Sequence, residues 1–72
     1  MKNIPLSPVD SSNVESIGYD ATKRILAVKF KSGGHYAYHG VSAADYASLN
    51  SAKSVGSHIS KHIVPKFKAQ KL

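Results

Sequence analysis

Residues 24–41 of this 72-residue chain are RILAVKFKSGGHYAYHGV, two alternating segments on either side of a Ser-Gly-Gly triplet. In the first segment Leu26, Val28 and Phe30 alternate with less apolar residues, and this period of two predicts a β-strand over residues 24–31. The triplet supplies residues that tolerate positive φ, as hairpin turns require. The second segment alternates in the same way, so we expect an antiparallel strand over residues 35–41.

The residues before this hairpin predict one more strand. Val14, Ile17 and Tyr19 are its apolar members, over residues 13–20. Gly18 interrupts the strand, as glycine does at a bulge or where another backbone approaches closely. Residues 21–23 then form a turn, since Asp20 suits the first position of a type I turn.

Two short helices are predicted after the hairpin. Ser42 and an acid three residues later form a capping box, which starts a helix that runs to about Ala52. Ser54 can cap a second helix, in which apolar residues recur every fourth position until Pro65 ends it.

The predicted fold class is therefore α+β, a three-stranded antiparallel meander followed by two short helices packed on one sheet face, with the other face open to solvent. We expect an extended leader over residues 1–10, a β-β-β-α-α domain over 11–65 and a loose basic tail over 66–72. The expected core comprises Ile17, Leu26, Val28, Phe30, Tyr36, Tyr38, Leu49, Ile59 and Ile63.

The length of the central loop decides which sheet face carries the tyrosines, because a one-residue slip moves every side chain to the other face. A three-residue loop pairs Lys31 with His35 and Val28 with Tyr38, so that both tyrosines lie under the helices. A two-residue loop would instead place the tyrosines beside the lysines of the preceding strand, a basic aromatic platform of the kind that stacks single-stranded bases. We favour the first register, because the second buries two histidines.

The charge is unevenly distributed along the chain. Ten Lys or Arg residues against four Asp or Glu give a formal net charge of +6, and all four acids lie in the first 45 residues. This asymmetry is typical of a protein with an anionic partner such as nucleic acid, while a net charge of this size also keeps ordinary small domains soluble. The candidate nucleic-acid-binding residues are Lys29, Lys31, His35, His39, Lys53, Lys61, Lys66 and Lys68.

Several other classes of function are disfavoured by the residues present. There is no cysteine, which excludes disulfides and thiolate metal sites. His58 and His62 are four residues apart, but no glutamate lies between them and Lys61 would repel a cation, so we expect no metal site and no cofactor. No nucleophile elbow or phosphate-binding glycine loop is present, and we expect no catalytic residues and no enzymatic activity. No apolar run reaches the ~20 residues of a membrane span, so we expect a cytoplasmic protein with no membrane contact.

Together these segments resemble the KTSC domain family. The resemblance covers residues 8–67 in order and spacing: Ser11-Ser12-Asn13-Val14, Ile17-Gly18-Tyr19-Asp20, Leu26-x-Val28-x-Phe30, Gly33, Tyr36-x-Tyr38-x-Gly40-Val41, Tyr46, Leu49, Ala52-x-Ser54-x-Gly56, Ile63 and Phe67. Of the family motif, Gly33, Tyr36, Tyr38, Ser54 and Gly56 are expected to be structural. Ser42 stands where the family tends to have proline, and Ile59-Ser60 where it tends to have an aromatic and then asparagine.

The resemblance implies a small domain that occurs at the C-terminus of some lysyl-tRNA synthetases and as free-standing bacterial and phage proteins. The first functional hypothesis is a nucleic-acid-binding module, with RNA as the partner. The alternative is a protein-interaction or structural accessory protein, of phage or bacterial origin, that uses a strand edge or the open sheet face. The sequence leaves its oligomeric state open.

Overall fold

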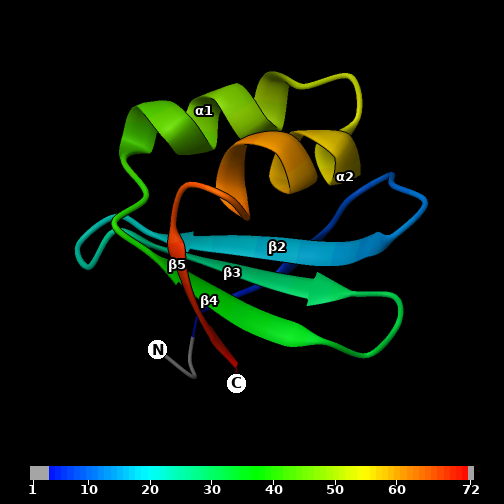
Figure 1. The fold of residues 1–72 in the computed structure, drawn as a ribbon, viewed down its shortest axis with the longest axis horizontal. Coiled ribbons are helices and arrows are strands. Elements are labelled where there is room, and N and C mark those ends of the chain that lie inside the picture. Colours follow the sequence, from blue (N-terminus) through cyan, green and yellow to red (C-terminus); the bar gives the residue numbers. More distant parts are fainter. Residues whose placement is uncertain (1–3, 72) are drawn as a thin grey trace.

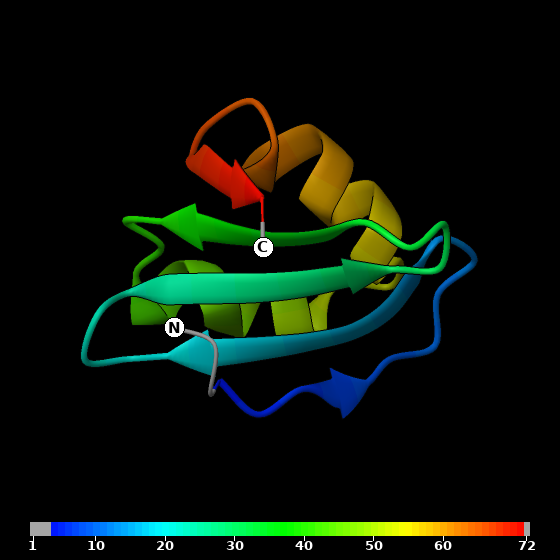
Figure 2. The same cartoon turned by 90° about the horizontal axis from the view of Figure 1, so that it is seen from below.

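The structure, a computed structural model, describes residues 4–71 and is an antiparallel sheet with helices on one face (Figure 1). Across the sheet the strands follow their order in the chain, as Figure 2 shows: β1 (Ser7–Pro8), β2 (Val14–Asp20), β3 (Ile25–Phe30), β4 (His35–His39) and β5 (Lys68–Lys71). Between β4 and β5 the chain forms α1 (Ala43–Ser51), α2 (Val55–His58) and a π-helical turn, η1 (Ile59–Ile63).

The α+β class is confirmed, but the three-stranded meander is wrong: the described residues form a five-stranded sheet. The three predicted strands are its centre, and the additional strands are its two edges. β1 comes from the expected leader and pairs Ser7 with Ile17, while β5 comes from the expected loose tail and pairs Lys71 with Tyr36. Neither segment shows the alternation of apolar and polar residues that predicts a strand, because the side chains of β1 and β5 are exposed on both faces.

The face assignment of the central hairpin is confirmed, although its pairing is shifted by two residues. Lys29 pairs with His35, Val28 with Tyr36 and Leu26 with Tyr38, where Lys31–His35 and Val28–Tyr38 were expected. The Phe30 N–H donates to the Gly34 carbonyl (2.8 Å), so the pairing continues to these two residues and the turn is centred on Ser32 rather than on Gly33. Because side chains alternate with a period of two, this shift keeps both tyrosines on the face that the helices cover.

The second sheet face, expected to be open to solvent, is closed at its centre. Gly18, Ala27 and Ala37 form one row of paired residues there, and the two alanines are 1% and 0% exposed. A Cβ at Gly18 would overlap the Pro5 carbonyl oxygen and would lie 3.0 Å from Cγ2 of Ile4. The segment before β1 therefore packs on this face, and Gly18 is the close backbone approach that the sequence suggested.

The predicted helices are present with one change. Ser42 caps α1: the Asp45 N–H donates to Ser42 Oγ (3.1 Å) and the Ser42 N–H donates to the Asp45 carboxylate (3.3 Å), which completes the capping box. The second helix begins after Ser54 as expected, but from Ile59 it widens into a π-helix, in which the Val64 N–H donates to the Ile59 carbonyl (2.8 Å).

The core lies between the sheet and the helices. Seven of the nine expected residues belong to its buried cluster, and Phe30 and Tyr36 are half-buried against it. Val14 and Val41, which were not among the expected core residues, are both 0% exposed. They sit at the start of β2 and just beyond β4, where the alternating pattern ends, so their burial depends on the helices that close over them. No helix within residues 4–71 has the length and apolar character needed to cross a membrane.

Candidate nucleic-acid interface

Four lysines lie along the β5 side of the molecule. They come from three consecutive elements: Lys61 from η1, Lys66 from the turn after it, and Lys68 and Lys71 from β5. All four are exposed. Seen from below, η1 and β5 lie at the same side of the sheet, beyond β4 (Figure 2). We call this set of four lysines the basic edge.

Three histidines accompany these lysines. His39 pairs with Lys68 in the sheet, and its Nε2 is hydrogen-bonded to Oε1 of Gln70 at 3.0 Å. The rings of His58 and His62 lie 4.8 Å apart between their centres. Partial burial and the neighbouring His62 lower the pKa of His58, and Asp45 opposes this shift. His58 is therefore less readily charged than an ordinary histidine, and the constant positive charge of this side comes from the lysines.

Three of the four acids lie far from the basic edge. Asp10 precedes β2, whereas Glu15 and Asp20 lie on β2 itself, on the opposite side of the sheet from β5. The fourth, Asp45, is close enough to Lys66 and His58 for their charges to help lower its pKa, although the larger cause is hydrogen bonding to Ser42. Its carboxylate therefore serves the cap of α1.

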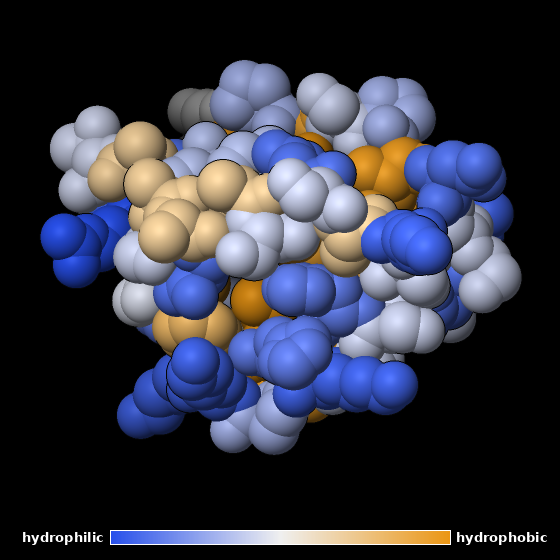
Figure 3. All heavy atoms as spheres, turned by 90° about the horizontal axis from the view of Figure 1, so that it is seen from above, coloured by the Kyte–Doolittle hydropathy of each residue, from blue (hydrophilic) through white to orange (hydrophobic). Residues whose placement is uncertain are grey.

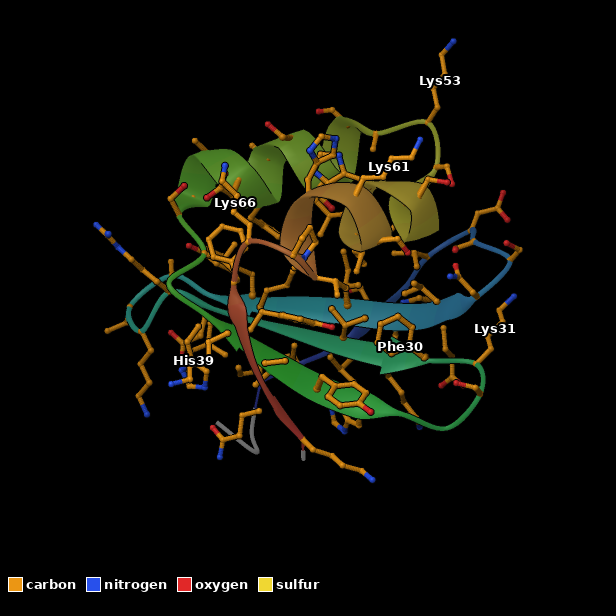
Figure 4. The ribbon with its side chains drawn as sticks, viewed as in Figure 1. Phe30, Lys31, His39, Lys53, Lys61 and Lys66 are labelled. Atoms are coloured by element: carbon orange, nitrogen blue, oxygen red, sulfur yellow. The ribbon has the colours of Figure 1, made fainter. Side chains whose placement is uncertain are left out.

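The structure brings together only some of the candidate binding residues. Lys61, Lys66 and Lys68 come from η1, the turn after it and β5, and His39 pairs with Lys68; in Figure 4 Lys61 lies high on the helical layer, Lys66 where the chain enters β5 and His39 at the end of β4. The others lie apart: Lys31 projects from the β3–β4 turn and Lys53 from the loop between α1 and α2 (Figure 4). Lys29 and His35 pair on the second sheet face.

Lys29 differs from the other lysines in having an acidic partner. Its ammonium lies 3.4 Å from the Glu15 carboxylate, and both side chains are about half exposed, at 45% and 53%. An exposed pair of this kind contributes little to stability. The Glu15 carboxylate does neutralise the charge of Lys29 locally, so Lys29 adds little net positive charge to the second sheet face.

Lys71 belongs to the basic edge but is absent from the sequence-derived list of binding residues. The tail was expected to be loose, and a lysine on a loose tail has no fixed place on a surface. Pairing of Lys71 with Tyr36 fixes it at the end of β5, three positions along the strand from Lys68. Viewed from the helix side, hydrophilic residues line the margin of the molecule on which β5 lies, with apolar residues further in (Figure 3).

The residues expected to be structural are placed accordingly. Gly33 has φ +104° in the central turn, a conformation that favours glycine. Ser54 caps α2, with its Oγ accepting from the Ser57 N–H (3.3 Å). A Cβ at Gly56 would overlap the Asn13 side-chain oxygen, so the loop before β2 packs directly on the start of α2. Two motif segments whose contacting residues are 43 positions apart in the sequence thus meet.

Tyr36 and Tyr38 also have structural positions. Tyr38 is 4% exposed in the core, and its burial, with Tyr36 beside it, raises the pKa of its hydroxyl. Tyr36 packs edge-on against Phe30, with ring centres 5.9 Å apart. Within residues 4–71 no group of three or more metal-ligating side chains is close enough together to hold an ion.

The KTSC domain family matches residues 10–67. A protein from Tsukamurella paurometabola is 36% identical over 64 residues, which cover 89% of this chain and 96% of that protein. A protein from Stutzerimonas stutzeri is 37% identical over 65 residues, 90% of this chain and 87% of its own. A lysine–tRNA ligase from Nostoc punctiforme is 32% identical over 68 residues, which are 94% of this chain and 12% of the ligase.

A solved structure shows the same architecture. The crystal structure of a KTSC domain protein from Yersinia pestis is 36% identical, with a TM-score of 0.91 over 96% of this chain and 97% of that one. The family match spans the strands β2 to β4, the helical layer and the motif residues described above. The chain belongs to the KTSC domain family.

Proposed function

We propose that this chain is a non-catalytic RNA-binding module, and that the basic edge contacts the phosphates. The observation that carries the proposal is the separation of charge across the sheet. The four lysines of the basic edge project from η1 to β5, whereas three of the four acids lie on or before β2. A cluster of one sign attracts a polyanion over a distance and fixes its orientation as it approaches.

The relatives add independent support from chemistry. One relative is a lysine–tRNA ligase, in which the matched region is 12% of the length. Such an enzyme takes an RNA substrate, and a small appended domain with a basic edge would add phosphate contacts without any change in the catalytic part. Lysine suits this role because its ammonium is a compact point charge that binds phosphate without demanding one geometry.

The expected salt dependence follows from the number of lysines. If each of the four lysines neutralises one phosphate, log K falls with log salt with a slope of about −2.8 to −3.6. Between 50 and 200 mM salt the affinity should then fall by roughly 50- to 150-fold. A transfer RNA titrated by fluorescence anisotropy at both salt concentrations measures this change.

Two variants with the same charge test where the RNA binds. In the first, Lys61, Lys66, Lys68 and Lys71 are replaced by glutamine; in the second, Lys23, Lys29, Lys31 and Lys53 are replaced instead. Each variant loses four positive charges, so net charge alone would weaken both equally. We expect the first to lose more than tenfold in affinity and most of the salt slope, and the second to lose far less. Absence of binding by the unmodified chain at 50 mM salt would refute the proposal, and equal losses in the two variants would refute the site.

One observation favours the alternative, a protein-interaction module. β5 is the last strand of the sheet and all four of its residues are exposed, so its outer edge presents backbone groups that another strand could pair with. Lysines on an edge strand are, however, a common device that prevents such pairing. Native mass spectrometry of the chain, alone and with a candidate partner, would detect a complex. A complex that forms equally well without Lys68–Lys71 would exclude this edge.

A further inference from the structure

The aromatic side chains of the chain are all engaged in packing. There are four tyrosines, two phenylalanines and no tryptophan, and all six lie among the described residues. None is exposed. The rings of Tyr19 and Tyr46 stack with centres 4.6 Å apart, which joins β2 to α1. Tyr38 lies in the core, and Phe67, which lies between Lys66 and Lys68 in the sequence, packs against the core.

The other planar groups of the described residues are imidazoles near the basic edge and one distant arginine. His39 is hydrogen-bonded to Gln70, and the rings of His58 and His62 lie against each other. The single arginine, Arg24, lies in the turn between β2 and β3 rather than on the β5 side. Among residues 4–71 the planar groups next to these lysines are therefore imidazoles, with no exposed tyrosine, phenylalanine or arginine beside them.

This arrangement discriminates between two kinds of RNA. Proteins that hold unpaired bases stack them on aromatic rings, and each stacked base contributes about 1–3 kcal/mol. Double-stranded RNA is recognised differently, through its shape and through contacts to phosphates and 2′-hydroxyls. A surface with lysines and with no exposed tyrosine or phenylalanine ring can make the second kind of contact and has only imidazoles for the first.

The lysines are also held in fixed relative positions. Lys68 and Lys71 are three positions apart on one strand, so their Cα atoms are separated by about 10 Å. Pairing of β5 with β4 holds both, and side chains an odd number of positions apart point to opposite faces of the sheet. A strand edge with positive charge on both of its faces can meet the two phosphate backbones that border one groove.

We propose that the basic edge binds base-paired RNA, such as the stem of a hairpin, in preference to single strands. This inference rests on the proposed RNA-binding function and adds the class of RNA to it. Recognition is through the phosphate backbones, so the sequence of the stem has little effect on affinity.

The test compares two RNAs with equal numbers of nucleotides, a stable hairpin and an unstructured oligouridine, titrated into the full chain by fluorescence anisotropy at 50 mM salt. We expect the hairpin to bind at least tenfold more tightly, and a hairpin of scrambled stem sequence to bind within about twofold of the first. If neither RNA binds, the proposed function itself fails. If both bind and the oligouridine binds equally or more tightly, RNA binding stands and the preference for a stem is refuted.

A pair of variants separates charge from stacking. Phe67→Leu and Tyr36→Leu remove the aromatic rings next to the basic edge, and circular dichroism confirms that each variant is folded. The hairpin affinity should stay within about twofold of the unmodified chain. The glutamine variant of the four basic-edge lysines should lose more than tenfold. A loss of tenfold or more in a folded leucine variant would show that the ring holds a base and would overturn the inference.

Discussion

Replacement of Gly18 by alanine tests whether the segment before β1 is part of the folded domain. The added Cβ would overlap the Pro5 carbonyl oxygen and press on Cγ2 of Ile4 at 3.0 Å. The Pro5 oxygen belongs to the backbone and cannot rotate away as a side chain would, so the segment must shift or detach. Forcing an extra methyl group into a close-packed place costs about 1–3 kcal/mol.

The size of this effect is easy to measure in a domain of this length. For 60–100 residues, each kcal/mol of lost stability lowers Tm by about 4–8 °C, so we expect Gly18→Ala to melt roughly 5–20 °C lower. Urea unfolding followed by circular dichroism gives the free energy directly. Tyrosine fluorescence provides a second probe, because the chain contains no tryptophan.

The same substitution in a shortened chain tests whether the contact with Pro5 is the cause of the destabilisation. In a chain that lacks residues 1–6, the Pro5 oxygen is absent and Gly18→Ala should be neutral or stabilising by up to ~1 kcal/mol, since alanine restricts the unfolded chain more than glycine does. The two changes are therefore coupled, and a double-mutant cycle measures the coupling. Equal destabilisation by Gly18→Ala in both backgrounds, or none in the full chain, would refute the assigned packing.

Substitutions at three further residues test the helical layer. Tyr19→Phe removes the hydroxyl that donates to the Val41 carbonyl at 2.5 Å and should cost about 1 kcal/mol in urea unfolding, while Tyr19→Leu should cost more because it also removes the stacked ring. Leu49→Ala removes the buried residue of α1 and should cost about 2–5 kcal/mol; a cost below 1 kcal/mol would contradict its 0% exposure. Hydrogen bonds from Ser42 lower the pKa of Asp45 from 3.8, so its stabilisation is complete above that pH and is lost as the pH falls through the lower, folded value. Asp45→Asn should flatten this part of an acid titration followed by circular dichroism, and an unchanged curve would exclude the assignment.

The parts of the fold that the sequence predicted are those in which a side-chain pattern reports a buried face. Leu26, Val28 and Tyr38 alternate because one face of β3 and β4 meets the helices, and the face assignment survived a two-residue change in pairing. Ser42 marked the start of α1 because the cap is a local interaction between side chain and backbone.

The edges of the sheet lack such a pattern. β1 is Ser-Pro and β5 is Lys-Ala-Gln-Lys, and all six residues are exposed. Their place in the sheet is set by backbone pairing with β2 and β4, which leaves no periodic trace in the side chains. The position of Lys71 depends on that pairing, and this is why the sequence could supply the positive charge of the basic edge but not its arrangement. The sequence pattern does not indicate the π-helical widening at Ile59 either, since Ile59 and Ile63 keep the helical spacing and both remain buried.

The order of strands in the sheet also determines the order of folding events. From β1 to β4 every pair of neighbours in the sheet is adjacent in the chain, so each pairing closes only a short loop and can form early. Pairing of β5 with β4 differs, because the whole helical layer lies between the two strands in the chain. Tyr36 meets Lys71 across 35 positions, so this pairing closes a much longer loop. Contacts that form after the rate-limiting step act on the rate of unfolding. We therefore expect the strand that carries half of the basic edge to dock last during folding, so that the domain acquires its charged face only once the rest has folded.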